Sequence, residues 1–151
     1  MNIVLIEPYF TGSHKNWAVG LQKHSSHSIE LLTLPGSFWK WRMHGGAVTL
    51  ARMFMESGLS PDLILATDML DVSTFLSLTR TNTGNIPIAL YNFPLCTVPE
   101  KYRGYAHASI SDWKKKYLDF CTDCVTKLEC CGVFEWHTEK RGFANLTPVL
   151  Q

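Results

Sequence analysis

The sequence has no apolar run that approaches the roughly 20 residues of a membrane-spanning helix. Its start has neither the basic region nor the apolar length of a secretory signal peptide. The formal net charge is only +1, so the chain as a whole is not drawn to nucleic acid or to a membrane surface. Five cysteines, an odd number, do not form a closed disulfide framework. These absences predict a cytoplasmic protein without a membrane partner.

Two common nucleotide-binding signatures are also absent. No strand is followed by GxGxxG, or by GxxxxGK with Ser or Thr after it. This argues against a Rossmann dehydrogenase and against a P-loop nucleotidase. What the chain does contain is 46% apolar and 18% charged residues over a length of 151. Such a chain is long enough for a substantial core and too apolar for a disordered tail.

Short apolar runs alternate along the first 91 residues with stretches whose apolar side chains repeat at helical spacing. The runs predict strands at 2–6, 28–34, 62–67 and 87–91. The stretches between them predict helices whose apolar faces include Ala18, Leu50 and Phe75. Regular alternation of this kind indicates a three-layer α/β fold with a parallel sheet and right-handed crossovers. Ligands of such folds bind beyond the carboxyl ends of the strands.

The loop after the first predicted strand is a candidate anion site. We expect Pro8 to stop the strand, Gly12 to allow a tight turn and Ser13 to cap the helix that follows. Gly12, Ser13, His14 and Lys15 would then lie at a helix N-terminus, where free N–H groups and the helix dipole favour phosphate. The same residues also fit an ordinary capped turn with polar side chains in water.

A second unusual cluster is Trp39-Lys40-Trp41-Arg42. Tryptophan faces stack on bases or sugar rings, while Lys and Arg contact phosphates. Alternatively, one tryptophan is buried against the next helix and the other residues are in water. Both interpretations are open from the sequence.

Three acidic residues are expected near the carboxyl ends of the strands: Glu7, Asp68 and Asp71. Each could act as a base or bind a hydroxyl group. Asp71 is equally suited to cap the helix predicted over 72–79.

The regular alternation ends after Tyr91. Pro94, Pro99 and Gly104 predict a loop over 92–105. A helix capped by Ser111 or Asp112 is expected next, and the remainder to residue 151 is predicted to be an irregular tail. The apolar face of that helix would be formed by Trp113, Tyr117, Phe120, Cys121 and Cys124.

The cysteines raise the question of zinc. Cys121-x-x-Cys124 resembles half of a zinc site, and Cys130, Cys131 and His137 follow it. However, no second Cys-x-x-Cys completes the pattern, and the first pair falls on an apolar helical face. We therefore expect cysteines packed in the core and no metal.

Three stretches, taken together and in order, resemble the N-terminal region of the tRNA-queuosine α-mannosyltransferases, also called glycosyltransferase-like domain-containing proteins. They are 7–15 (EPYFTGSHK), 32–35 with 39–43 (LTLP and WKWRM) and 65–70 (LATDML). The likeness covers about residues 1–91. It implies a GT-B glycosyltransferase with two Rossmann-like domains, which transfers mannose from GDP-mannose to queuosine in tRNA.

The resemblance also implies roles for individual residues. Gly12, Ser13, His14 and Lys15 would line the interdomain cleft near the donor phosphate, with His14 in polar contact with the sugar. Trp39, Trp41 and Arg42 would face the tRNA nucleoside, and Asp68 would be an acceptor-side ligand. GDP-mannose would be the donor substrate, with no further cofactor, and no catalytic residue is identified.

The chain departs from the family after the fourth predicted strand. Family members have a His-Glu-Asn-Gln motif there, whereas this chain has Asn92-Phe93-Pro94-Leu95. The second Rossmann-like domain has no room in 151 residues. We therefore expect a Rossmann-like domain over 1–91, a divergent segment over 92–151, and a truncated chain that is not active alone. The alternatives are a non-catalytic nucleic-acid or protein interaction domain, and a flavodoxin-like enzyme acting on a free nucleotide or sugar phosphate.

Overall fold

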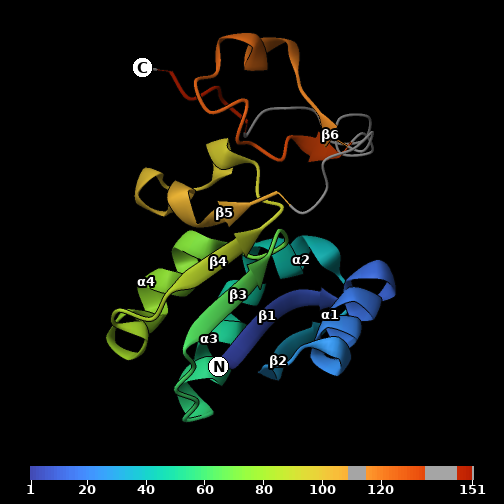
Figure 1. The fold of residues 1–151 in the computed structure, drawn as a ribbon, viewed down its shortest axis with the longest axis vertical. Helices are drawn as coiled ribbons and strands as arrows, with labels where there is room; N and C mark the ends of the chain where they lie inside the picture. The colour runs from blue at the N-terminus through green and yellow to red at the C-terminus, as the bar shows by residue number, and fades with distance from the viewer. Residues whose placement is uncertain (109–114, 135–145, 151) are drawn as a thin grey trace. The chain divides into compact units, whose positions relative to one another are not determined.

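The computed structural model describes residues 1–108, 115–134 and 146–150. Its main feature is an all-parallel sheet of five strands in the order β2-β1-β3-β4-β5 (Figure 1). This arrangement confirms the predicted Rossmann-like α/β class. The chain divides into two compact units, Met1–Ala89 and Leu90–Gln151. The strands are β1 (Asn2–Phe10), β2 (Ser28–Pro35), β3 (Leu63–Thr67), β4 (Ile88–Tyr91) and β5 (Ala106–His107).

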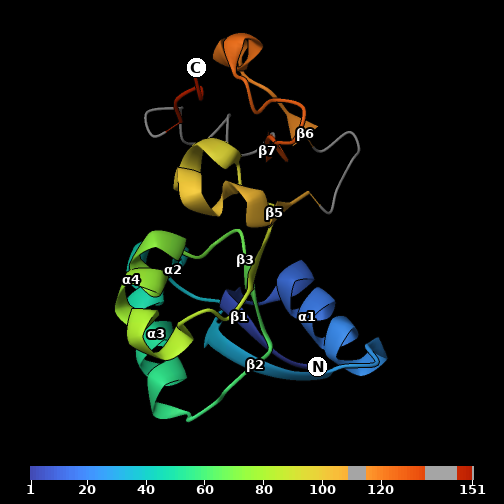
Figure 2. The same ribbon diagram turned by 60° about the vertical axis from the view of Figure 1, so that its left-hand side comes forward.

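The helices of the first unit lie on both faces of its strands. They are α1 (Gly12–His24), α2 (Trp39–His44), α3 (Gly46–Glu56) and α4 (Val72–Thr83). Figure 2 shows α1 on one face of the strands and α3 with α4 on the other. The buried side chains of α3 are the residues that the helical spacing indicates, among them Leu50 and Phe54. Phe54 meets Phe75 of α4 edge-on, with ring centroids 6.0 Å apart.

β1 is the central strand of the first unit, with β2 on one side and β3 on the other. It is longer than predicted, because it continues through Pro8 to Phe10 instead of stopping at the proline. The pairing with β2 shifts register between Glu7 and Phe10. Since proline has no N–H to donate to a ladder, this irregularity lets Pro8 remain within the strand.

The start of α1 also differs from the expectation. Thr11, not Ser13, is the N-cap residue, and its side chain makes no capping hydrogen bond. Gly12 has φ +51°, a left-handed conformation that glycine adopts without strain, so the tight turn predicted there is confirmed. Ser13 consequently lies inside the first helical turn, where it caps nothing.

The start of α4 follows the prediction for Asp71. One carboxylate oxygen accepts the backbone N–H of Thr74 at 3.0 Å, and the other accepts its hydroxyl at 2.9 Å. Asp71 is therefore the N-cap of α4, and both of its carboxylate oxygens are used in capping the helix. The helix ends at Thr83, four residues beyond the predicted range 72–79.

The second unit is built from short elements. Two 3₁₀ helices, η1 (Leu95–Thr97) and η2 (Glu100–Tyr105), occupy most of the predicted loop. β6 (Lys115–Lys116) pairs antiparallel with β7 (Val133–Phe134), and η3 (Asp119–Asp123) lies between them in the chain.

The helix predicted after Asp112 is wrong over residues 115–124. Residues 109–114, with Trp113 and the proposed caps, lie outside the described residues. The pairing of β6 with β7 occupies the backbone groups of Lys115 and Lys116 that a helix would need. Gly132, at φ +69°, allows the chain to return for this pairing, since a Cβ there would lie 2.8 Å from the carbonyl oxygen of Lys116.

The expectation of core cysteines is also wrong. All five cysteines keep part of their surface exposed. Among the described residues, no group of three or more His, Cys, Asp or Glu side chains is placed to hold a metal ion. His137 lies outside the described residues. No helix in the described part of the chain is long and apolar enough to cross a membrane.

Candidate functional site

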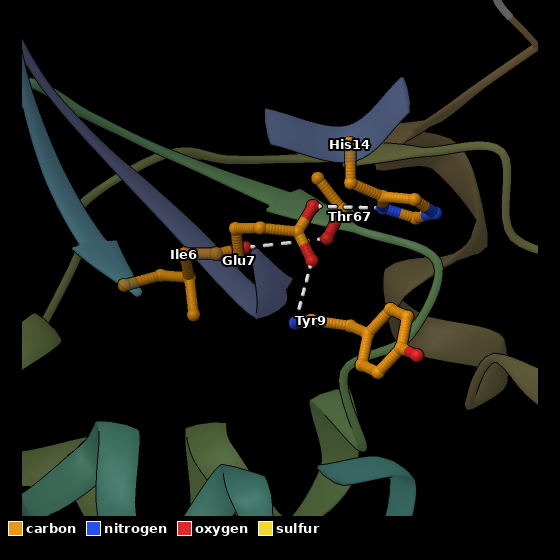
Figure 3. Close-up of polar contacts among 5 residues, drawn as sticks. All are labelled: Ile6, Glu7, Tyr9, His14 and Thr67. Atoms are coloured by element: carbon orange, nitrogen blue, oxygen red, sulfur yellow. Dashed lines mark hydrogen bonds and ion pairs between the residues drawn. The ribbon is translucent and has the colours of Figure 1, made fainter. Parts of the chain in front are cut away.

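Three ionisable side chains of the first unit interact electrostatically at the carboxyl ends of β1 and β3. Glu7 comes from the last part of β1, His14 from the first turn of α1, and Asp68 directly follows β3. We call these three residues the carboxylate–histidine cluster. Figure 3 shows Glu7 between His14 and the backbone of Tyr9, with Thr67 of β3 beside it.

Glu7 is fully buried, with 0% of its surface exposed. Its Oε2 lies 2.9 Å from Nδ1 of His14, and its Oε1 accepts the backbone N–H of Tyr9 at 2.7 Å (Figure 3). A buried carboxylate is costly unless it is paired and hydrogen-bonded. Glu7 meets that condition, because each of its oxygens has a partner.

His14 is held in place by Glu7 and by an aromatic neighbour. The ring of Tyr9 meets the imidazole edge-on, with centroids 6.4 Å apart. The hydrogen bond with Glu7 is the main reason why the pKa of His14 lies above its ordinary value of 6.5. Burial lowers that pKa, and the negative charges of Glu7 and Asp68 raise it further. The protonated imidazolium is therefore favoured here, while 30% of the side chain stays exposed.

Asp68 completes the cluster from the other strand. Although the residue is partly exposed, burial of its carboxyl group raises its pKa from 3.8 to about 6. The positive charge of His14 lowers this pKa, and the negative charge of Glu7 raises it. A carboxyl group that titrates near neutral pH beside a histidine is a common feature of functional sites.

The rest of the predicted anion site is more open. Gly12, Ser13 and Lys15 are exposed, and the first turn of α1 carries no acidic residue. Nζ of Lys15 lies 5.8 Å from the centroid of the Phe10 ring. Of the four predicted residues, only His14 enters the carboxylate–histidine cluster; phosphate binding by the others remains a prediction.

The second predicted cluster lies on α2, which contacts β1. Trp41 is 71% exposed and Trp39 is partly buried. Nε of Arg42 donates to the carbonyls of Pro35 and Ser37, each at 3.2 Å. Arg42 thus fastens the loop between β2 and α2.

Phe38 is an aromatic residue of this region that sequence reasoning missed. It precedes α2 with φ +52° and is 77% exposed. A left-handed conformation is unusual for a bulky residue and is often found at functional positions. No sequence motif indicates that Phe38 is unusual, because residue spacing does not specify a left-handed backbone conformation.

The pairing of Glu7 with His14 was also not predicted, although both residues were singled out. A signal does exist in the sequence. Glu7 is the one charged residue of a strand that is mostly apolar and aromatic, and a histidine follows seven positions later, in the first turn of the next helix. A buried carboxylate at that position needs a partner, and His14 is the nearest base along the chain.

A family model described as tRNA-queuosine alpha-mannosyltransferase N-terminal matches residues 2–93, more than half of the chain. The matched range contains the carboxylate–histidine cluster and all of α2. No solved structure matches the chain.

Proposed function

The chain belongs to the tRNA-queuosine alpha-mannosyltransferase N-terminal family, and from this we propose that it provides the substrate-binding face of a glycosyltransferase. The reaction would transfer mannose from GDP-mannose to queuosine in tRNA. The observation that carries the proposal is the carboxylate–histidine cluster at the carboxyl ends of β1 and β3. Ligands of parallel α/β sheets bind beyond that edge.

On the donor side, we assign His14 and the start of α1 to the sugar nucleotide. A protonated His14 can donate to a phosphate or sugar oxygen from the ring edge opposite Glu7. The helix start adds backbone N–H groups, and Lys15 adds a positive charge. When His14 is protonated, its positive charge offsets the charge of Glu7, so the pair opposes an incoming phosphate less than an unpaired carboxylate would.

On the acceptor side, we assign Trp39, Trp41 and Asp68 to the queuosine nucleoside. The exposed face of Trp41 can stack on a base, and the carboxylate of Asp68 can accept a hydrogen bond from a hydroxyl group. Arg42 was expected to contact the nucleoside. Its hydrogen bonds to Pro35 and Ser37 support a different task, which is to hold α2 in position.

We further propose that the domain over 1–91 binds substrates without transferring the sugar by itself. In a GT-B enzyme a second domain closes the cleft, excludes water and holds the donor over the acceptor. The described residues of this chain supply one such wall. Binding, not turnover, is therefore the property to measure.

The test is titration calorimetry of the full chain with GDP-mannose and with tRNA that carries or lacks queuosine. His14→Ala should weaken GDP-mannose binding roughly tenfold or more, since it removes a charged hydrogen bond. His24→Ala, at the exposed end of α1, is the matched control and should bind like the wild type. Trp41→Ala should weaken tRNA binding, with Trp17→Ala of α1 as its control.

Two results would contradict the proposal. One is a folded chain that binds neither GDP-mannose nor queuosine tRNA. The other is tRNA binding that falls steeply with salt and ignores queuosine, which would favour the non-catalytic interaction domain, because phosphate contacts carry no sequence information.

A further inference from the structure

A fully buried glutamate in an interior strand of a sheet requires an explanation, because an apolar residue would serve the fold at lower cost. We propose that Glu7 is the positioning residue of His14: it takes the Nδ1 edge of the ring and leaves Nε2–H as the group that contacts an oxygen of the donor substrate. The identity of that substrate rests on the proposed function. The arrangement of the ring rests on the geometry alone.

The two oxygens of Glu7 have separate roles. Oε1 accepts the N–H of Tyr9 at 2.7 Å, which fixes the rotation of the carboxylate against its own strand. Oε2 is thereby directed at Nδ1 of His14, 2.9 Å away. The edge-on Tyr9 ring, at an interplanar angle of 87°, limits rotation of the imidazole from another side (Figure 3). His14 is consequently held by one short strand segment through two separate contacts.

This arrangement decides which nitrogen is free for chemistry. A carboxylate only accepts hydrogen bonds, so Nδ1 carries a proton in both the neutral and the charged ring. Nε2 lies on the opposite edge of the ring and points away from Glu7 (Figure 3). The His14 side chain as a whole is 30% exposed, as contact with a ligand requires.

The surrounding negative charges favour the protonated imidazolium, in which Nε2 carries a hydrogen that it can donate. The titratable groups that act on His14 are Glu7 from β1 and Asp68 from the segment after β3. Both raise the pKa of His14, and the bond to Glu7 has the largest effect. When the ring is protonated, Nε2–H donates. Its natural partner is then an electron-rich oxygen, either of the diphosphate or of a sugar hydroxyl.

The first experiment is long-range ¹H–¹⁵N NMR of the histidines in the ¹⁵N-labelled full chain, recorded across a pH titration. We expect neutral His14 to be the Nδ1–H tautomer, with a pKa above the ordinary histidine value of 6.5. Glu7→Gln should lower the His14 pKa. Asp62→Asn should leave it unchanged, because that carboxylate is bonded to the backbone of Asn2 at the opposite end of the strands.

The wild-type spectrum decides the matter even if Glu7→Gln does not fold. A neutral His14 with its proton on Nε2 would overturn the role of Glu7. So would a folded Glu7→Gln variant with an unchanged His14 pKa and tautomer. Neither result depends on which substrate the protein binds.

The second experiment adds ligands to the same sample. GDP-mannose should shift the ¹⁵N signal of Nε2 much more than that of Nδ1, and folded Glu7→Gln should bind GDP-mannose roughly tenfold more weakly. A shift produced by GDP alone identifies the diphosphate as the contact; a shift that requires GDP-mannose identifies the sugar. The Nδ1–H tautomer without any ligand shift would overturn Nε2 as the ligand contact and the proposed donor site with it.

Discussion

The two compact units of this chain satisfy their backbone hydrogen bonds in different ways. In Met1–Ala89, β1 pairs with β2 over residues 2–7 and with β3 over residues 3–6, and the side chains at the centre of β1 and β3 are buried. In Leu90–Gln151, strands of two residues and 3₁₀ turns predominate. The first unit is therefore stabilised mainly by apolar burial, and the second depends more on individual polar contacts.

In the second unit, side chains form hydrogen bonds with backbone groups that, in a β-sheet, would be paired with a neighbouring strand. Sγ of Cys130 accepts the N–H groups of Leu95 and Gly132, at 3.3 and 3.4 Å. Nε of Arg103 donates to the carbonyls of Leu95 and Val98, both at 3.2 Å. In the first unit, Arg42 makes the same kind of hydrogen bonds to the loop that follows β2. An arginine thus stabilises non-repetitive backbone in both units.

The largest expected effect concerns the apolar core of the first unit. Phe54→Ala should lower the free energy of unfolding by about 3–5 kcal/mol, because it removes a ring that is only 2% exposed and leaves a cavity beside Phe75. Phe38→Ala is the matched control, since its ring is exposed, and should change stability by less than about 0.5 kcal/mol. Urea denaturation measures both. Equal losses would contradict a core centred on α3 and α4.

A smaller effect is expected at two glycines with similar backbone conformations, one in each unit. At Gly58, which has φ +66°, a Cβ would have no atom within 4 Å, whereas a Cβ at Gly132 would lie 2.8 Å from the carbonyl oxygen of Lys116. Gly58→Ala should cost about 1–2 kcal/mol, because alanine is strained in a left-handed conformation. Gly132→Ala should cost more, because the β6–β7 pairing must also shift.

Amide hydrogen exchange distinguishes the two glycine variants. Gly132→Ala should accelerate exchange around β6 and β7, while Gly58→Ala should act around the end of α3. Equal costs without faster exchange at β6 and β7 would show that this pairing does not hold the second unit together.

The pH dependence caused by Asp68 should be similar in size to the effect of Gly58→Ala. Its pKa is raised to about 6 in the folded protein, so the folded state binds more protons than the unfolded state between about pH 4 and 6. Stability should therefore fall as the pH rises through this window. Asp68→Asn should remove this dependence and raise stability above pH 6 by roughly 1–2 kcal/mol, a value reduced from the full shift because the residue is partly exposed.

Urea denaturation of Asp68→Asn and wild type at pH 4.5 and 7.5 measures this difference. The raised pKa of His14 adds a contribution of the same sign, since its stabilisation is present below pH 6.5 and is lost as the pH rises through its folded pKa. Asp62→Asn, at an exposed carboxylate, should keep the wild-type dependence. An unchanged slope in Asp68→Asn would contradict a buried Asp68 carboxyl group.

The strands of the first unit and most of its helices could be predicted from the sequence, whereas the second unit could not, for a physical reason. β2, α3 and β3 follow from local apolar periodicity, and Asp71 follows from the chemistry of helix caps, which acts over three residues. The region 115–124 has an equally plausible helical pattern, but β6 pairs with β7, more than 15 positions away in the chain. Local periodicity carries no signal for such a pairing.

For the candidate site, too, local sequence patterns predict some features and tertiary packing decides the others. The alternation of apolar runs is sufficient to place Glu7, His14 and Asp68 near strand ends, because carboxyl ends of parallel strands share one edge. Only the folded chain brings Glu7 within 2.9 Å of His14, buries Asp68 enough to raise its pKa and turns Arg42 toward the loop before α2. Periodicity specifies which face of an element is buried. Which polar groups meet there depends on three-dimensional packing, because a distance between side chains on different elements is set by the whole fold.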